Sequence, residues 1–295
     1  MTIVACWLDE SYSVTSLAAL ADARASERVG TVWYTHSDNT IKLFSIDVRC
    51  FDMDALTPGL GAWMNPYYET TIGLGFAGHC FEALTVIAHI QRAMGALIIA
   101  DGKKVQPVSD GLVNLAKEIA ERYLRDHKFG SMRDLELLLF GWDGPAQPWI
   151  AKLVWDRQTK KVVNTVTKPS KPDVVTIGDG AKASKRFGIA ARIRKKIARQ
   201  LERFVSAPLS QQGAFSQAIL EIEASRRMEE GVGALVESQF VRSVGGVRQK
   251  LQVAWEGGRA VAAFTADDQP HIMDGLPSVR TDTSLGPVPI VTKMK

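Results

Sequence analysis

The chain has 295 residues, of which 46% are hydrophobic and 23% charged, and its formal net charge is +4. These values are ordinary for a globular protein, and so small a net charge gives no reason to expect nucleic-acid binding. No apolar run approaches the roughly 18–20 residues that cross a bilayer, and the first residues lack the features of a secretion signal. The cysteines Cys6, Cys50 and Cys80 are widely spaced, so we expect a cytoplasmic protein without disulfides, metal or membrane contact.

The first half of the chain alternates apolar runs with turn signals. A long excursion at about residues 47–69 contains Pro58, Gly59, Gly61 and Pro66, and we interpret it as an insertion between strands. Helices are expected at 81–94 and from Ser109 onward, where apolar residues recur at helical spacing. Strands are expected at residues 2–7, 14–20, 31–34, 40–46 and 70–77.

The second half repeats the order of strands followed by two helices. Residues 160–172 are polar with two prolines and predict a loop, and residues 266–295 predict an extended tail after a single domain of residues 1–265. The expected strands are 135–142, 151–156, 174–177, 235–241, 247–255 and 259–264, with helices at 184–206 and 215–230. Two antiparallel sheets flanked by helix pairs satisfy this order, so we predict an α+β, four-layer αββα sandwich.

Basic residues concentrate between residues 182 and 203. Ile189, Ile193, Ile197 and Leu201 recur every fourth residue there and predict one buried stripe. We interpret the basic residues as the solvated outer face of a packed helix, with a docking surface for an acidic partner or nucleic acid as the alternative.

Residues 73–78 match the pattern G-x-G-x-x-G of dinucleotide-binding loops, and Asp101 follows a later apolar run. The stretch before these glycines is polar, however, and the chain lacks the strand–helix alternation of a parallel sheet. A dinucleotide-binding enzyme is therefore a distant alternative. His79 and Cys80 are adjacent at an expected helix start, so their side chains should diverge rather than form a catalytic dyad.

An ordered set of segments resembles the proteasome β-type subunits and the bacterial proteasome-like proteases, which are N-terminal-nucleophile hydrolases. No single segment is specific, but together they follow the family order over approximately residues 2–264. The segments are TIVA at 2–5, ADARAS at 21–26, TIKL at 40–43, IGLGFAGHCFEALTVIAHIQRAM at 72–94, LLFGWD at 138–143 and IGDG at 177–180.

The resemblance implies a threonine endopeptidase. A threonine hydroxyl needs a base, and removal of Met1 would give Thr2 an α-amino group with a pKa of about 7.7–8.0 that can serve as that base. By resemblance, Thr2 is the nucleophile, Lys42 the activating cation and Asp22 the carboxylate that orients Lys42. The remaining roles carried over are the oxyanion-binding N–H for Gly78, support of Asp22 for Arg24, and pairing of the main chain with an extended peptide for Ser26 and Cys80.

The sequence also departs from the family pattern. Asp179 stands where the family has a serine that assists the amine, and Ser243 lacks the aspartate that accompanies it in the family. The alternative is therefore an inactive scaffold with the same fold. For either form the resemblance implies self-association into rings without a cofactor, and for the enzyme a peptide or unfolded-protein substrate. It leaves open whether an ATP-driven unfoldase feeds the chain.

Overall fold

The computed structural model describes twelve stretches of the chain. Only the backbone is described for residues 25–29, 32–37, 249–250, 263–266, 279–282 and 288–291. The described stretches are residues 4–9, 15–21, 25–29, 32–37, 40–52, 65–98, 104–126, 134–169, 174–178, 249–266, 279–282 and 288–291.

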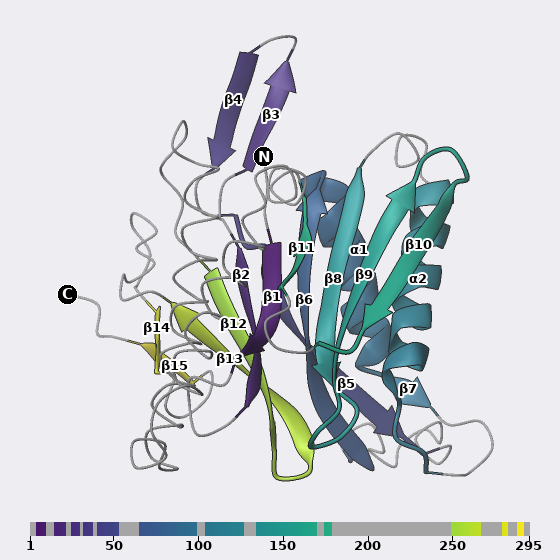
Figure 1. Cartoon of the computed structure of the whole chain (residues 1–295), viewed down its shortest axis with the longest axis vertical. Helices are drawn as coiled ribbons and strands as arrows, with labels where there is room; N and C mark the ends of the chain where they lie inside the picture. Colours follow the sequence, from purple (N-terminus) through teal and green to yellow (C-terminus); the bar gives the residue numbers. More distant parts are fainter. Residues whose placement is uncertain are drawn as a thin grey trace, which may run out of the picture.

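Two stacked sheets form the body of the protein (Figure 1). The first has five strands in the order β11-β1-β2-β12-β13, and all neighbours are antiparallel. Its strands are β1 (Val4–Asp9), β2 (Ser16–Ala21), β11 (Val174–Ile177), β12 (Gln249–Glu256) and β13 (Arg259–Ala266).

The second sheet has six strands in the order β10-β9-β8-β6-β5-β7. Only the short β7 runs parallel to its neighbour β5. The strands are β5 (Leu43–Phe51), β6 (Tyr68–Gly78), β7 (Leu97–Ile98), β8 (Leu135–Trp142), β9 (Pro148–Asp156) and β10 (Lys161–Thr167).

Two separate hairpins complete the described strands. The first joins β3 (Ala25–Val29) to β4 (Val32–Ser37), and the second joins β14 (Val279–Asp282) to β15 (Val288–Val291). Figure 1 shows β3 and β4 standing out beyond both sheets, at the end of the molecule where β1 begins.

The helices α1 (Cys80–Met94) and α2 (Ser109–Asp126) cover the outer face of the six-stranded sheet (Figure 1). The nearly continuous apolar sequence of β8 follows from this layering. Leu137 and Leu139 face the helices, whereas Leu138 and Phe140 face the other sheet. Because successive side chains of a strand point to opposite faces, a strand that is buried on both sides is apolar throughout.

A carboxylate from a distant strand end caps α2. Asp143, which follows β8, accepts hydrogen bonds from the Ser109 backbone N–H at 2.7 Å and from the Ser109 hydroxyl at 2.6 Å. The first N–H groups of a helix have no partner within the helix, and a negative charge there is favourable.

Replacing Asp143 by alanine is expected to lower the free energy of unfolding by about 1–2 kcal/mol, because the backbone N–H and the hydroxyl of Ser109 lose their charged acceptor. Asp126→Ala is the matched control. It removes a carboxylate from the other end of the same helix, where the charge is not favoured, and should change stability by no more than about 0.5 kcal/mol. Urea unfolding of both variants measures the difference, and equal effects would contradict a capping role.

The predicted α+β class with two stacked sheets is confirmed. The expected helices at 184–206 and 215–230 and the expected strand at 235–241 lie outside the described residues.

A separate cluster of buried residues forms on the five-stranded sheet, on strands β1 and β2. Its members are Ala5, Trp7, Ala18 and Leu20.

Several expected boundaries were wrong. Residues 47–51 belong to β5 and residues 68–69 to β6, so the excursion between these strands is shorter than the expected insertion at 47–69. The expected loop at 160–172 contains β10, which pairs with β9 along its whole length and buries Val162 against the helix-side core. The predicted extended tail contains the hairpin β14–β15, and strand β3 was not predicted.

The dinucleotide-binding alternative is wrong. The glycines at 73 and 75 lie inside β6, in an antiparallel arrangement with β5 and β8, and form no loop before a helix. A Cβ atom added at Gly73 would lie 2.1 Å from the Phe140 ring, and one at Gly75 would lie 2.7 Å from Val4. These glycines therefore allow side chains from neighbouring strands to approach the backbone closely.

Among the described residues, no helix is long and apolar enough to span a bilayer.

Candidate functional site

Ends of several strands meet at one end of the stacked sheets. In the first sheet Val4, where the description of β1 begins, pairs with Ala21 at the end of β2 and with Ile177 at the end of β11. The second sheet approaches the same point, because the Cβ position of Gly75 lies 2.7 Å from Val4 Cγ1 and 3.1 Å from Leu43 Cδ2. The starts of β1 and β5 and the ends of β2, β6 and β11 thus converge, towards the upper end of Figure 1.

Lys42 lies at this point, immediately before β5. Its side chain is only 1% exposed, and its carbonyl oxygen accepts a hydrogen bond from the Phe76 backbone N–H at 3.2 Å. Lysine is almost never fully buried unless it is paired. Lys42 is thus a buried cation beside the starts of β1 and β5, and its role as an activating lysine stays a prediction.

Gly78 ends β6 in a conformation that side chains disfavour. Its φ is +118°, and a Cβ atom added there would lie 2.1 Å from the Asp134 carbonyl oxygen. The Phe76 N–H points to Lys42, whereas the His79 N–H donates to Asp134 at 3.0 Å on the other side of the strand. Since N–H groups of a strand alternate in direction, the Gly78 N–H is directed to the Lys42 side, beyond the start of β5.

The first turn of α1 follows directly. His79 is its N-cap residue, and Nδ1 of His79 contacts the carboxylate of Glu82, which is buried. Cys80 instead packs against the helix-side core. The ring of His79 is thus engaged by Glu82. Sequence reasoning missed Glu82, although an acidic residue three positions after an N-cap is a recognised capping signal.

A second ion pair lies between the sheets near the same end. Glu136 in β8 contacts Lys152 in β9 at 3.2 Å and accepts a hydrogen bond from the Gly178 N–H at 3.1 Å. Sequence reasoning missed both charged residues. The available signal was a glutamate inside the otherwise apolar β8, because a charge on a buried strand needs partners.

Of the residues predicted for the site, the structure brings Lys42 and Gly78 to the same strand ends, whereas Cys80 lies in the first turn of α1 and packs against the helix-side core. Ser26 lies in β3 and pairs with Thr35 in β4, and only its backbone is described. The remaining predicted residues lie outside the described ranges. They are Thr2, Asp22, Arg24, Asp179 and Ser243.

The described thiols differ in environment, and none forms a disulfide. Burial raises the pKa of Cys6 well above its ordinary value, and burial also raises the pKa of Cys50. A raised pKa disfavours the reactive thiolate, so neither residue is suited to nucleophilic chemistry. The described residues also include no group of three or more side chains arranged to hold a metal ion.

A shallow cavity of about 510 Å³ lies at the other end of the sheets. It is lined by Leu8, near the end of β1, and by Trp142, the last residue of β8, together with residues 145–148 and 168–169. Its position at the far end of β1 separates it from Lys42 and Gly78.

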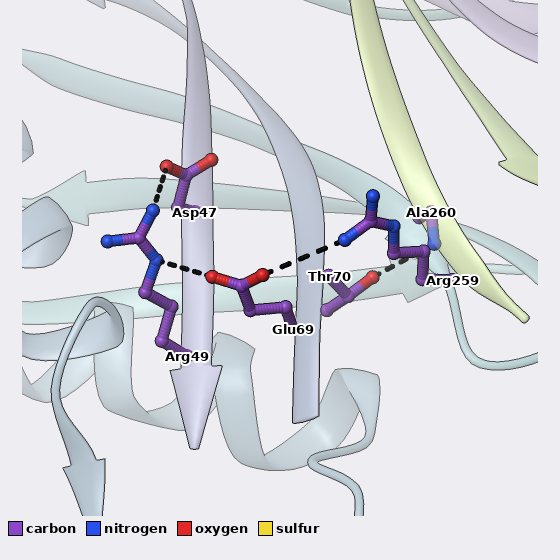
Figure 2. A network of polar contacts seen from close by, with 6 residues as sticks. All are labelled: Asp47, Arg49, Glu69, Thr70, Arg259 and Ala260. Carbon is purple, nitrogen blue, oxygen red and sulfur yellow. Dashed lines mark hydrogen bonds and ion pairs between the residues drawn. The ribbon is translucent and has the colours of Figure 1, made fainter. Parts of the chain in front are cut away.

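The same far end contains an exposed network that joins the two sheets. Figure 2 shows Glu69 in β6 between Arg49 of β5 and Arg259 of β13, at 2.9 and 3.7 Å. Beside it, the Thr70 hydroxyl oxygen accepts a hydrogen bond from the Ala260 N–H at 3.0 Å. Exposed ion pairs of this kind contribute little to stability.

No protein-family model and no curated protein matches the sequence. Among solved structures, the chain is similar to the Anbu complex from Pseudomonas aeruginosa, a helical assembly, with 17% identity over 91% of this chain and 88% of that chain and a TM-score of 0.44. Anbu (ancestral beta-subunit) from Yersinia bercovieri has 16% identity over 92% and 89% with a TM-score of 0.40. Eukaryotic HslV from Trypanosoma brucei has 14% identity over 78% and 91% with a TM-score of 0.33. Identities and TM-scores this low identify neither a family nor an activity.

Proposed function

We propose that the chain is a proteasome-like N-terminal-nucleophile hydrolase that cleaves peptide bonds through Thr2 after removal of Met1. The observation that carries the proposal is the convergence of strand ends around the buried Lys42 and the Gly78 N–H. Thr2 precedes Val4 by two residues, and Asp22 follows Ala21 directly in the sequence. Val4 and Ala21 are paired neighbours at this same end.

The proposed reaction needs only groups of the chain, the peptide and water. The Thr2 hydroxyl oxygen attacks the peptide carbonyl carbon while the α-amino group takes the hydroxyl proton. The tetrahedral oxyanion accepts a hydrogen bond from the Gly78 N–H. The amine then passes the proton to the departing peptide nitrogen, which leaves an ester on Thr2. Water, deprotonated by the same amine, hydrolyses that ester and restores the hydroxyl.

Lys42 would act on this reaction through its charge. A cation near the N-terminus disfavours protonation of the α-amine, so more of the amine is neutral and able to accept the proton near pH 7. Asp22 would hold the Lys42 ammonium in place, and Arg24 would support Asp22. An extended peptide would add as a strand along the main chain at Ser26 and Cys80.

An inactive oligomeric scaffold is the second candidate function. Asp179 in place of the family serine, and Ser243 without its aspartate, favour this alternative. Both candidates would self-associate into rings in the cytoplasm. They differ in whether Thr2 reacts.

The intact mass of the purified protein, with and without a threonine-reactive peptide epoxyketone, tests the proposal. We expect loss of the Met1 mass and addition of one inhibitor per chain, because the free amine and the hydroxyl of Thr2 act together. Thr2→Ala should show the same loss of Met1 and no adduct. Retained Met1 without an adduct would exclude the peptidase for this protein and favour the scaffold.

A further inference from the structure

Two charged side chains lie on the inter-sheet face of the second sheet, close to the candidate site. Glu136 and Lys152 project from β8 and β9 beside Leu138 and Ile150, which belong to the apolar core between the sheets. Their side chains are 20% and 31% exposed, so much of their surface is removed from water. Buried ion pairs are weak sources of stability, and apolar residues of similar volume often replace them without loss.

The pair contacts the end of β11 and the following Gly178 through two hydrogen bonds, and a third contact joins its two members. Glu136 Oε2 lies 3.2 Å from Lys152 Nζ and 3.1 Å from the Gly178 backbone nitrogen. Lys152 Nζ also donates to the Thr176 carbonyl oxygen at 3.3 Å. β11 is a four-residue edge strand that pairs only with β1 in the first sheet. The hydrogen bonds from Glu136 and Lys152 of the second sheet therefore help to hold its end in place.

These contacts border the candidate site on two sides. Glu136 pairs with Ala77, the residue before Gly78, in the β6–β8 register. Ile177, the residue before Gly178, pairs with Val4 in β1. Gly178 is buried with a φ of +86°, a conformation that favours glycine.

We propose that Glu136 and Lys152 are positioning residues that fix Gly178 and the end of β11 against the start of β1 and supply compensating charges to the proposed N-terminal nucleophile. This inference rests on the proposed function. The pair touches neither the substrate nor the reacting atoms. It acts by holding the backbone of β11 and through the electrostatic field of its two charges.

The rate of epoxyketone labelling tests the positioning. Glu136→Ala removes the acceptor for the Gly178 N–H, and we expect labelling to slow by about 10- to 100-fold, the loss typical of a displaced reacting group. Glu136→Gln retains an amide oxygen that can accept the same hydrogen bond, and should label within about 3-fold of the wild-type rate. Slow labelling of Glu136→Ala together with nearly normal labelling of Glu136→Gln would show that the rate depends on the hydrogen bond and not on the charge.

The pH dependence of labelling tests the charges, because labelling requires the neutral α-amine. Glu136→Gln leaves the Lys152 cation without its counter-charge, which disfavours protonation of the amine. The pH at which labelling is half-maximal (the midpoint) should therefore fall. Lys152→Met leaves the Glu136 carboxylate alone, so the midpoint should rise. Each shift should be on the order of 0.5 pH unit, as expected for a charge about 10 Å away at an effective dielectric constant near 40. The double variant should return close to the wild-type midpoint.

The network of Figure 2 provides the matched control. Glu69 and Arg259 also form an ion pair between the two sheets. Glu69 lies nine residues before Gly78 on the same strand, about 30 Å away at the rise of a strand. Glu69→Gln and Arg259→Met are expected to leave the labelling rate and its midpoint unchanged.

The outcomes separate the two proposals. The positioning role is supported if three results are found. The wild type labels, Glu136→Gln and Lys152→Met shift the midpoint in opposite directions, and Glu136→Gln labels much faster than Glu136→Ala. If the wild type labels but the variants keep its rate and midpoint, or differ only in thermal stability, the pair is merely structural and this inference is overturned. If the wild type does not label, the proposed peptidase fails and the positioning role fails with it.

Discussion

Replacing Gly78 by alanine is expected to lower the free energy of unfolding by about 3 kcal/mol or more. A φ of +118° is costly for any residue with a Cβ atom, and such strain costs about 1–3 kcal/mol. The added Cβ would also lie 2.1 Å from the Asp134 carbonyl oxygen, so the backbone of one strand has to move. Because that movement displaces the Gly78 N–H, we expect epoxyketone labelling to fall by about 10²- to 10³-fold as well.

Gly111→Ala is the matched control for this glycine. Gly111 lies in α2, and a Cβ atom added there would meet nothing within 4 Å. Alanine at an exposed helical position should stabilise the protein by about 0.5–1 kcal/mol and leave labelling unchanged. Urea unfolding and labelling of both variants measure these effects. A Gly78→Ala protein with wild-type stability would contradict the strained backbone, and one with wild-type labelling would contradict an oxyanion-binding role.

Replacing Lys42 by methionine is expected to slow labelling at pH 7.5 by about 10³-fold, within the range of losses seen when an electrostatic or proton-transfer group is removed. The side chain is almost completely buried, so solvent does not screen its charge strongly. Loss of the cation also favours the protonated amine, so the pH midpoint of labelling should rise by about 1 unit or more. Rates measured between pH 6 and pH 10 give both quantities.

Lys161→Met controls for the loss of a positive charge. Lys161 is an exposed residue at the start of β10, and its replacement should leave both the rate and the midpoint unchanged. A general loss of folding by Lys42→Met would lower labelling at every pH without moving the midpoint, so the midpoint distinguishes the two explanations. An unchanged midpoint with an intact fold would remove Lys42 from the proposed mechanism.

Much of the layering followed from the sequence because apolar patterning records which faces of an element are buried. The predicted strand at 135–142 has the observed bounds of β8, and helices α1 and α2 begin within one residue of their expected starts. The loop predicted at 160–172 was wrong because β10 lacks the alternation of buried apolar and exposed polar residues: Val162 is buried, but Val163 and Val166 are exposed. Pairing with β9 supplies the hydrogen bonds that make that segment a strand.

Some residues of the candidate site could likewise be predicted from the sequence, and others could not. The sequence alone indicated Lys42 and Gly78, through the resemblance of the short segments that contain them. Sequence reasoning missed the pair of Glu136 and Lys152, because these residues are 16 positions apart and become neighbours only when β8 and β9 pair. It likewise did not link Asp143 to the start of α2, a contact between residues 34 positions apart.

The sequence by itself determined the position of β8, the starts of α1 and α2, the burial of both faces of β8 and the residue types available for chemistry. These properties depend on local spacing and on how each side chain interacts with water. Only the tertiary structure decided which strand ends converge, that the glycines of β6 allow close packing rather than cofactor binding, and which charges lie between the sheets. Those outcomes depend on pairing between residues far apart in the chain, which no local pattern specifies.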